Sequence, residues 1–265
     1  MSDLLHRAIA AHGGLDRFNQ FNTVSAHLVL GGRMWALKGQ EAVMSNARIR
    51  VTVDLHHEYA SLAPFQRANL RTAFTPERVA VETTEGAVVK ERTTPRAAFA
   101  GHTLHTPWDD LDFIYFASYT IWTYLTVPFC LTWPGFEVAE IEPWQEQDQT
   151  WRRLKVTFPP HIASHSTEQT FYFGDDGLLR RHDYEVEIAG NAPGAAHYVS
   201  EYQDVSGIMM PTKRRVFPRQ PDNTPALDWQ RLPAQQQLQR PRQPDNTPAL
   251  DTVLISIDLS EIRFA

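Results

Sequence analysis

The sequence predicts an α+β protein that is mostly antiparallel β, with an aromatic helix covering its sheet. Short segments with two-residue apolar alternation recur along the 265 residues, and no βαβ alternation separates them. This pattern favours one antiparallel sheet or open barrel. A run of 24 residues without a charge, at 113–136, interrupts the strands and has helical spacing. Because such a sheet is commonly covered on one face, we expect this helix to be the cover.

The first half of the chain is predicted to begin with a helix and to continue in strands. The opening segment, 1–14, is amphipathic and stops at its terminal glycine pair. The alternating segments that follow are 24–30, 49–55, 78–82 and 87–90. Glu85-Gly86 lies between the last two segments and indicates a hairpin. A short helix at 95–100 is expected before the aromatic run.

The aromatic helix is predicted to span 108–127. Thr106 is the expected N-cap, Pro107 suits the first helical position, and Asp109 completes a capping box. A helix that is apolar on all sides must be buried in protein or in lipid. A bilayer span needs about 20 apolar residues and basic flanks, but Pro128 breaks this run and no basic cluster borders it. We therefore expect a buried helix, not a membrane span.

The second half is predicted to hold more strands and one unusual loop. The strands are 137–142, 150–158, 169–173, 178–188, 197–202, 213–217 and 253–258. Residues 218–228 read PRQPDNTPALD, and 241–251 repeat this sequence letter for letter. Two copies are too few for a solenoid, and the stretch is rich in proline and glutamine. We expect one domain, 1–265, in which 218–251 is a duplicated, mobile loop insertion.

Composition argues against several classes of function. The apolar fraction of 42% and the charged fraction of 21% are those of a globular protein. A net charge of −6 without a basic stripe argues against nucleic acid as a partner. Cys130 is the only cysteine, which excludes an intramolecular disulfide. The opening helix does not resemble a secretion signal, so we expect a cytoplasmic protein. The oligomeric state cannot be predicted from the residues.

The eleven histidines do not form a metal-binding motif. His102 and His105 could converge with His182 in space, but none of them belongs to an H-E-x-x-H motif. The glycine-rich nucleotide motifs and the G-x-S-x-G nucleophile motif are absent as well. We therefore expect neither a metal nor a cofactor.

Strand 178–188 carries the best candidates for chemistry. Alternation places His182 and Tyr184 on one face and Arg181 and Asp183 on the other. The charged face is expected to be solvated. His182 and Tyr184 should therefore point inward.

Two alternatives stay open from the residues alone. An inward His182 could be a general acid or base near neutral pH, or a core histidine that a hydrogen bond satisfies. In strand 197–202, either His197 or Tyr198 could face the interior.

Several motifs in the second half are family signatures. They are DGLL at 176–179, YQDVSGI at 202–208 and PTK at 211–213. With these motifs the chain resembles bacterial domains of the outer-membrane lipoprotein carrier (LolA/LppX-like) type, especially an uncharacterised group among them. The resemblance covers most of the chain but not the duplicated loop. It implies a strongly curved half-barrel wrapped round helices, with an apolar cavity able to hold an acyl chain or a comparable ligand.

The leading functional hypothesis is binding of an apolar small molecule or lipid-like ligand between the sheet and the aromatic helix. The residues expected to line the cavity are Trp108, Tyr115, Tyr119, Trp122, His182 and Tyr184. The alternative is a cofactor-independent enzyme, a hydrolase, cyclase or isomerase. In that case His182 would be the acid or base, and Tyr184 or Tyr119 would donate to an oxyanion.

Overall fold

A computed structural model describes residues 2–44, 49–190, 192–226 and 253–265. Its described strands form one antiparallel sheet of thirteen, in the order β6-β5-β4-β3-β2-β1-β13-β12-β11-β10-β9-β8-β7. The first six are β1 (Thr23–Gly31), β2 (Ile49–Asp54), β3 (Ala60–Ala63), β4 (Leu70–Thr75), β5 (Arg78–Thr83) and β6 (Val88–Thr93). The others are β7 (Glu137–Glu146), β8 (Gln149–Thr157), β9 (Glu168–Phe173), β10 (Leu179–Tyr184), β11 (Ala195–Val205), β12 (Ile208–Pro218) and β13 (Ile255–Phe264). The predicted fold class is confirmed, although β3 and β4 were not predicted.

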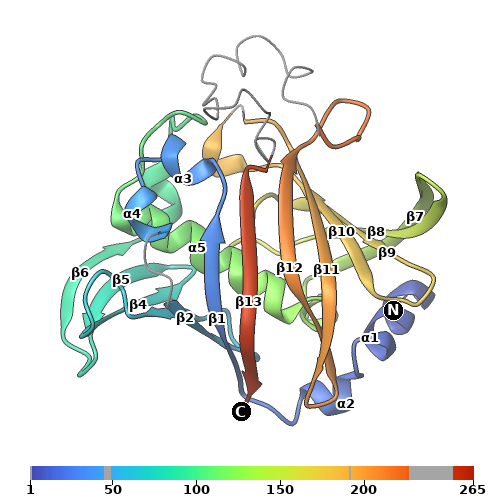
Figure 1. Ribbon diagram of the computed structural model, residues 1–265, viewed down its shortest axis with the longest axis horizontal. Coiled ribbons are helices and arrows are strands. Elements are labelled where there is room, and N and C mark those ends of the chain that lie inside the picture. The colour runs from blue at the N-terminus through green and yellow to red at the C-terminus, as the bar shows by residue number, and fades with distance from the viewer. Residues whose placement is uncertain (1, 45–48, 191, 227–252) are drawn as a thin grey trace, which may run out of the picture.

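The described helices are short, apart from two. They are α1 (Asp3–Ala11), α2 (Leu15–Phe18), α3 (Met34–Leu37), α4 (Glu41–Met44) and α5 (Asp110–Thr126), with 3-10 turns η1 (Pro95–Phe99), η2 (Phe129–Thr132) and η3 (Glu187–Ala189). The sheet curls round α5, with α3 and α4 near one end of that helix and α1 and α2 near the other (Figure 1). None of the described helices is long and apolar enough to cross a membrane.

The strand order explains why α5 lies inside the sheet. β6 and β7 are the two edges of the sheet, yet they are consecutive along the chain. The connection between them, residues 94–136, must therefore pass from one edge to the other. It carries α5 through the space that the curled sheet encloses, which we call the hollow (Figure 1). A helix enclosed in this way meets protein on every side. Every residue from Leu111 to Thr126 is buried, as the uncharged sequence indicated.

The start of α5 differs from the prediction. Asp109, not Thr106, is the N-cap, and its side chain forms a capping box with Asp112. Arg92 of the edge strand β6 pairs with both carboxylates, at 2.6 Å and 2.7 Å. The Thr106 hydroxyl instead accepts a hydrogen bond from the backbone of Thr103. The helix therefore starts two residues later than predicted, because two paired carboxylates stabilise its amino end better than one hydroxyl.

The duplicated segment is only partly described. Pro218 ends β12, and residues 219–226 form a turn with a bridge between Arg219 and Pro225. Residues 227–252, which include the second copy, lie outside the described residues. The mobile insertion at 218–251 therefore stays a prediction, although the start of its first copy has defined hydrogen bonds.

Candidate functional site

The hollow contains a layer of buried polar side chains between α5 and strands β10 to β12. We call it the inner polar layer. Its members are Tyr119, Tyr124, His165, His182, Tyr184, His197 and Arg214. All seven are nearly inaccessible to solvent, so their hydrogen bonds must be made within the protein.

His165 lies at the centre of this layer. Its Nδ1 is 3.2 Å from the hydroxyl of Tyr119, and its Nε2 is 2.8 Å from the hydroxyl of Tyr124. The Tyr124 hydroxyl also lies 3.0 Å from that of Tyr184, whose ring stacks on the His165 imidazole at 3.7 Å. Burial lowers the pKa of His165 well below its usual value. The imidazole is therefore neutral at pH 7, with one ring nitrogen donating and the other accepting.

His182 points inward, and it is hydrogen-bonded. The amide nitrogen of Gln169 donates to the Ser166 carbonyl at 2.9 Å, which turns the amide oxygen toward His182. His182 Nε2 donates to that oxygen at 2.6 Å, so the proton lies on Nε2. Burial also lowers the pKa of His182 well below its usual value. A catalytic role for His182 and Tyr184 stays a prediction, and the pairing with Gln169 favours the core-histidine alternative.

His197 and Arg214 differ from the rest of the layer because each has a buried nitrogen without a hydrogen-bond partner among the described residues. His197 faces inward, which settles the alternative with Tyr198, and its ring lies 4.5 Å from that of Tyr124. Among the described residues, neither His197 ring nitrogen nor Arg214 Nε has a hydrogen-bond partner. Arg214 Nη2 donates to the Tyr124 carbonyl at 2.6 Å.

The other face of β10 contradicts the prediction that it is solvated. Arg181 and Asp183 are both buried, and Arg181 Nε donates to Asp183 Oδ1 at 2.6 Å. Around this pair lie Glu146, Tyr172 and Tyr198, which with it form the outer polar cluster. The carbonyl of Asn223 also accepts from Arg181, so the turn at 219–226 covers this face. The charged face is buried because the chain returns over it after β12, which strand alternation could not reveal.

The other predicted lining residues lie at different places along α5 and before it. Tyr115 and Tyr119 are neighbours, with ring centroids 5.3 Å apart, and Tyr119 belongs to the inner polar layer. Trp108 packs on Phe116 at 4.9 Å, before the start of the helix. Trp122 instead donates to the carbonyls of Asp54 and His57, which anchors α5 to the turn after β2. A ligand contact for these residues stays a prediction.

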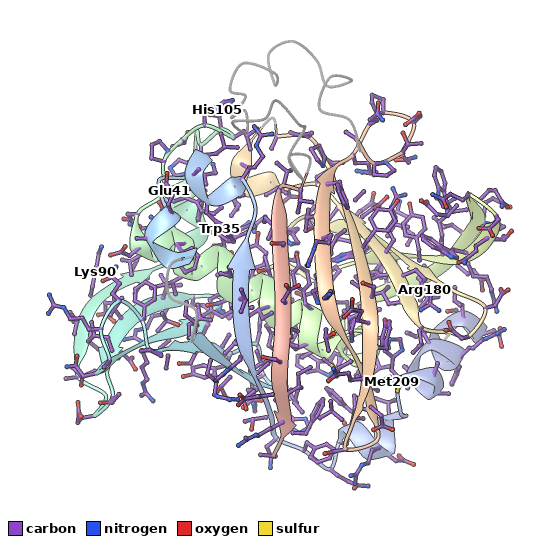
Figure 2. The ribbon with its side chains drawn as sticks, viewed as in Figure 1. Trp35, Glu41, Lys90, His105, Arg180 and Met209 are labelled. Atoms are coloured by element: carbon purple, nitrogen blue, oxygen red, sulfur yellow. The ribbon has the colours of Figure 1, made fainter. Side chains whose placement is uncertain are left out.

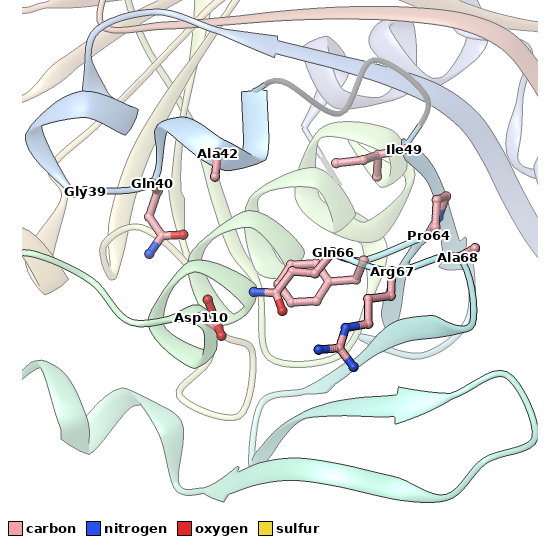
Figure 3. A pocket seen from close by; sticks show the side chains of 10 residues that line it. Gly39, Gln40, Ala42, Ile49, Pro64, Gln66, Arg67, Ala68 and Asp110 are labelled. Carbon is pink, nitrogen blue, oxygen red and sulfur yellow. The ribbon is translucent and has the colours of Figure 1, made fainter.

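An open cleft lies at the amino end of α5. It has a volume of about 670 Å³ and is lined by Gly39, Gln40, Ala42, Ile49, Pro64, Phe65, Gln66, Arg67, Ala68 and Asp110 (Figure 3). Its apolar floor includes Ile49 and Phe65, which are 3% and 2% exposed, while Gln66 and Arg67 are exposed at its rim. Trp35 of α3, which Figure 2 shows, packs on Phe113 of α5 with the ring centroids 5.5 Å apart.

A second, narrower slot is lined in part by Met34 of α3 and has a volume of about 30 Å³. Tyr184 supplies the only polar side chain among the described residues that line it. The lining residues are Met34, Leu104, Phe116, Tyr184, Val186, Ala189, Ala192, Pro193, Ala195, Val216, Leu254 and Ile255.

The described residues contain no cluster of three or more histidine, cysteine or acidic side chains arranged to hold a metal ion. The possible convergence of His102, His105 and His182 is therefore not found. His102 instead packs against Phe99 at 5.2 Å.

Sequence reasoning missed three members of the inner polar layer, namely Tyr124, His165 and Arg214. His165 lies in the proline- and serine-bounded loop before β9. A loop lacks the strand alternation from which the direction of a side chain can be predicted. Arg214 alternates with Val216 on β12, and this parity was the one available signal that its guanidinium points inward.

Comparison with known proteins gives similarity in structure but not in sequence. No protein-family model matches the chain, and no curated protein matches it either. A DUF1329 family protein from Desulfovibrio piger is 10% identical with a TM-score of 0.47, over 98% of this chain and 91% of that one. A LolA superfamily protein from Nitrosomonas europaea is 9% identical with a TM-score of 0.47, over 99% and 92%.

A third solved structure is a domain described as an outer membrane lipoprotein-sorting protein, from Vibrio parahaemolyticus. It is 8% identical with a TM-score of 0.48, over 99% of this chain and 91% of that one. At this level of similarity the ligand of this chain has to be inferred from its own geometry.

Proposed function

We propose that the protein binds an apolar small molecule or lipid-like ligand in the cleft at the amino end of α5. The cleft carries the proposal because its volume of about 670 Å³ falls within the roughly 300–1,000 Å³ of small-ligand sites. Its floor is apolar at Phe65 and Ile49, and Gln40, Gln66 and Arg67 place polar groups around it. Such a combination holds a hydrophobic body while orienting a polar end.

The proposed position differs from the predicted one by a short distance along α5. Tyr119 is enclosed in the inner polar layer and lines neither opening, whereas the cleft beside Asp110 has room for a ligand. Gln40 connects the cleft to Trp108, because its side-chain nitrogen donates to the Trp108 carbonyl at 2.7 Å. A ligand in the cleft would therefore lie close to the backbone of Trp108.

A direct test is to fill the cleft. Ala42 lines it and is exposed, so Ala42→Trp should place an indole in the ligand's space without disturbing the core. The neutral lipophilic dye Nile red should fluoresce with the unaltered protein and bind at least about tenfold more weakly to Ala42→Trp, a loss of about 1.4 kcal/mol.

The matched control is Ala87→Trp, at an exposed alanine before β6 that is remote from the cleft lining. It should bind the dye as the unaltered protein does. Equal binding by all three proteins, or no binding by any, would refute the cleft as the site.

A further inference from the structure

Among the described residues that line the cleft at the amino end of α5, Arg67 and Asp110 carry charged side chains. Arg67 belongs to the turn between β3 and β4, and Asp110 to the first turn of α5. Figure 3 shows them on different sides of the cleft. Asp110 has a basic partner outside the lining, because Lys90 Nζ of β6 lies 3.6 Å from its carboxylate. The charge of Asp110 is thus balanced within the protein.

Arg67 differs from Asp110 in this respect. It is exposed, and among the described residues no carboxylate forms an ion pair with its guanidinium. The other two carboxylates at the start of α5, those of Asp109 and Asp112, both pair with Arg92. An anion that enters the cleft therefore meets a cation that the described protein does not neutralise. A cation would have to compete with Lys90 for Asp110.

The turn that carries Arg67 is held beside the apolar floor of the cleft. The Phe65 backbone nitrogen donates to the Leu70 carbonyl at 2.9 Å, and the Arg67 backbone nitrogen donates to the Phe65 carbonyl at 2.6 Å. The Phe65 ring is 2% exposed and stacks on Phe113 of α5, with the ring centroids 6.3 Å apart. Arg67 therefore lies two residues from a ring that the core fixes, at the border between the apolar floor and solvent.

We propose that the ligand of the cleft is an acyl-chain carboxylate, whose carboxylate pairs with Arg67 and whose chain lies on Phe65 and Ile49. This inference rests on the proposed function and names the class of ligand. Guanidinium N–H groups form a planar fork that matches the two oxygens of a carboxylate. The single negative charge of a carboxylate equals the charge of Arg67. Removal of the chain from water supplies affinity, and the ion pair sets the orientation of the ligand.

The test measures displacement of Nile red by decanoate and by 1-decanol, which has the same chain without the charge, at pH 7 and equal ionic strength. The two compounds also differ in hydration, so the quantity compared between proteins is the ratio of their affinities. The preference for decanoate should be about fivefold greater in the unaltered protein than in Arg67→Gln, as expected for one ion pair that solvent partly screens. The control Arg263→Gln, at an exposed arginine of β13, should keep the ratio of the unaltered protein.

Reversal of the charge gives a second measurement. The unaltered protein should bind decanoate more tightly than decylammonium, and Arg67→Glu should show the opposite preference. The same ratio of decanoate to 1-decanol affinity in the unaltered protein and in Arg67→Gln would overturn the carboxylate proposal and leave binding in the cleft intact. Tighter binding of decylammonium by the unaltered protein would overturn it as well, and would indicate Asp110 as the partner. Failure of every compound and of Nile red to bind would refute the proposed function together with this inference.

Discussion

Each face of the sheet buries one arginine, Arg181 of β10 on the outer face and Arg214 of β12 on the inner face, and the two differ in their electrostatic surroundings. On the outer face Arg181 is buried beside Asp183 and Glu146, and its guanidinium makes hydrogen bonds in several directions. On the inner face Arg214 is equally buried, but no described carboxylate balances it. The difference teaches that burial alone does not mark a functional residue. The outer arginine is satisfied by the fold, whereas the inner one has unused capacity.

The largest expected effect is on the outer face. Arg181→Met leaves Asp183 buried without its cation, and breaking a buried pair in this way costs about 3–5 kcal/mol. Equilibrium unfolding in urea would measure the loss. A cost below about 1 kcal/mol would show that the outer polar cluster is solvated in solution. Arg181 would then not differ from Arg214 in the way that we describe.

Acid should destabilise the protein through the buried histidines of the inner polar layer. Burial lowers the pKa values of His165, His182 and His197, so the folded state resists protonation that the unfolded chain accepts. The stability they confer is present above the unfolded pKa of about 6.5 and is lost as the pH falls below it. Each histidine should lower the free energy of unfolding by about 1.4 kcal/mol for each pH unit below that value.

Urea unfolding at pH values on either side of 6.5 would measure this loss. His197→Phe should unfold with a shallower pH dependence, because one neutral histidine is removed. A stability that does not change across this range would mean that these imidazoles are not buried and neutral.

The smallest effect is expected for Arg214→Met. The substitution removes a cation whose burial is uncompensated, at the expense of one hydrogen bond to the Tyr124 carbonyl. The two contributions oppose each other, so the free energy of unfolding should change by no more than about 1 kcal/mol. The same substitution, arginine to methionine, should thus have a large effect on stability at Arg181 and a small one at Arg214. A loss at Arg214 as large as that at Arg181 would show that both are structural.

The sequence reveals the fold better than the site, for physical reasons. Alternation on β1 and β2 and the uncharged run of α5 record burial directly, so the sheet and its enclosed helix could be predicted. The inward direction of His182 also followed from parity. Parity cannot show that a distant turn covers the other face, so the burial of Asp183 was missed. Nor can it place the cleft, because Ala42 of α4 lines it and that helix was not predicted.

The most direct test of ligand binding in the hollow is a ¹H–¹⁵N correlation spectrum recorded while Nile red is added. We predict that the backbone amides of Gln66, Arg67 and Ala68 shift in proportion to occupancy, because they border the cleft. The amides of Tyr172 and Asp183 in the outer polar cluster should stay in place. Shifts confined to the outer face, or none at a saturating dye concentration, would contradict the account.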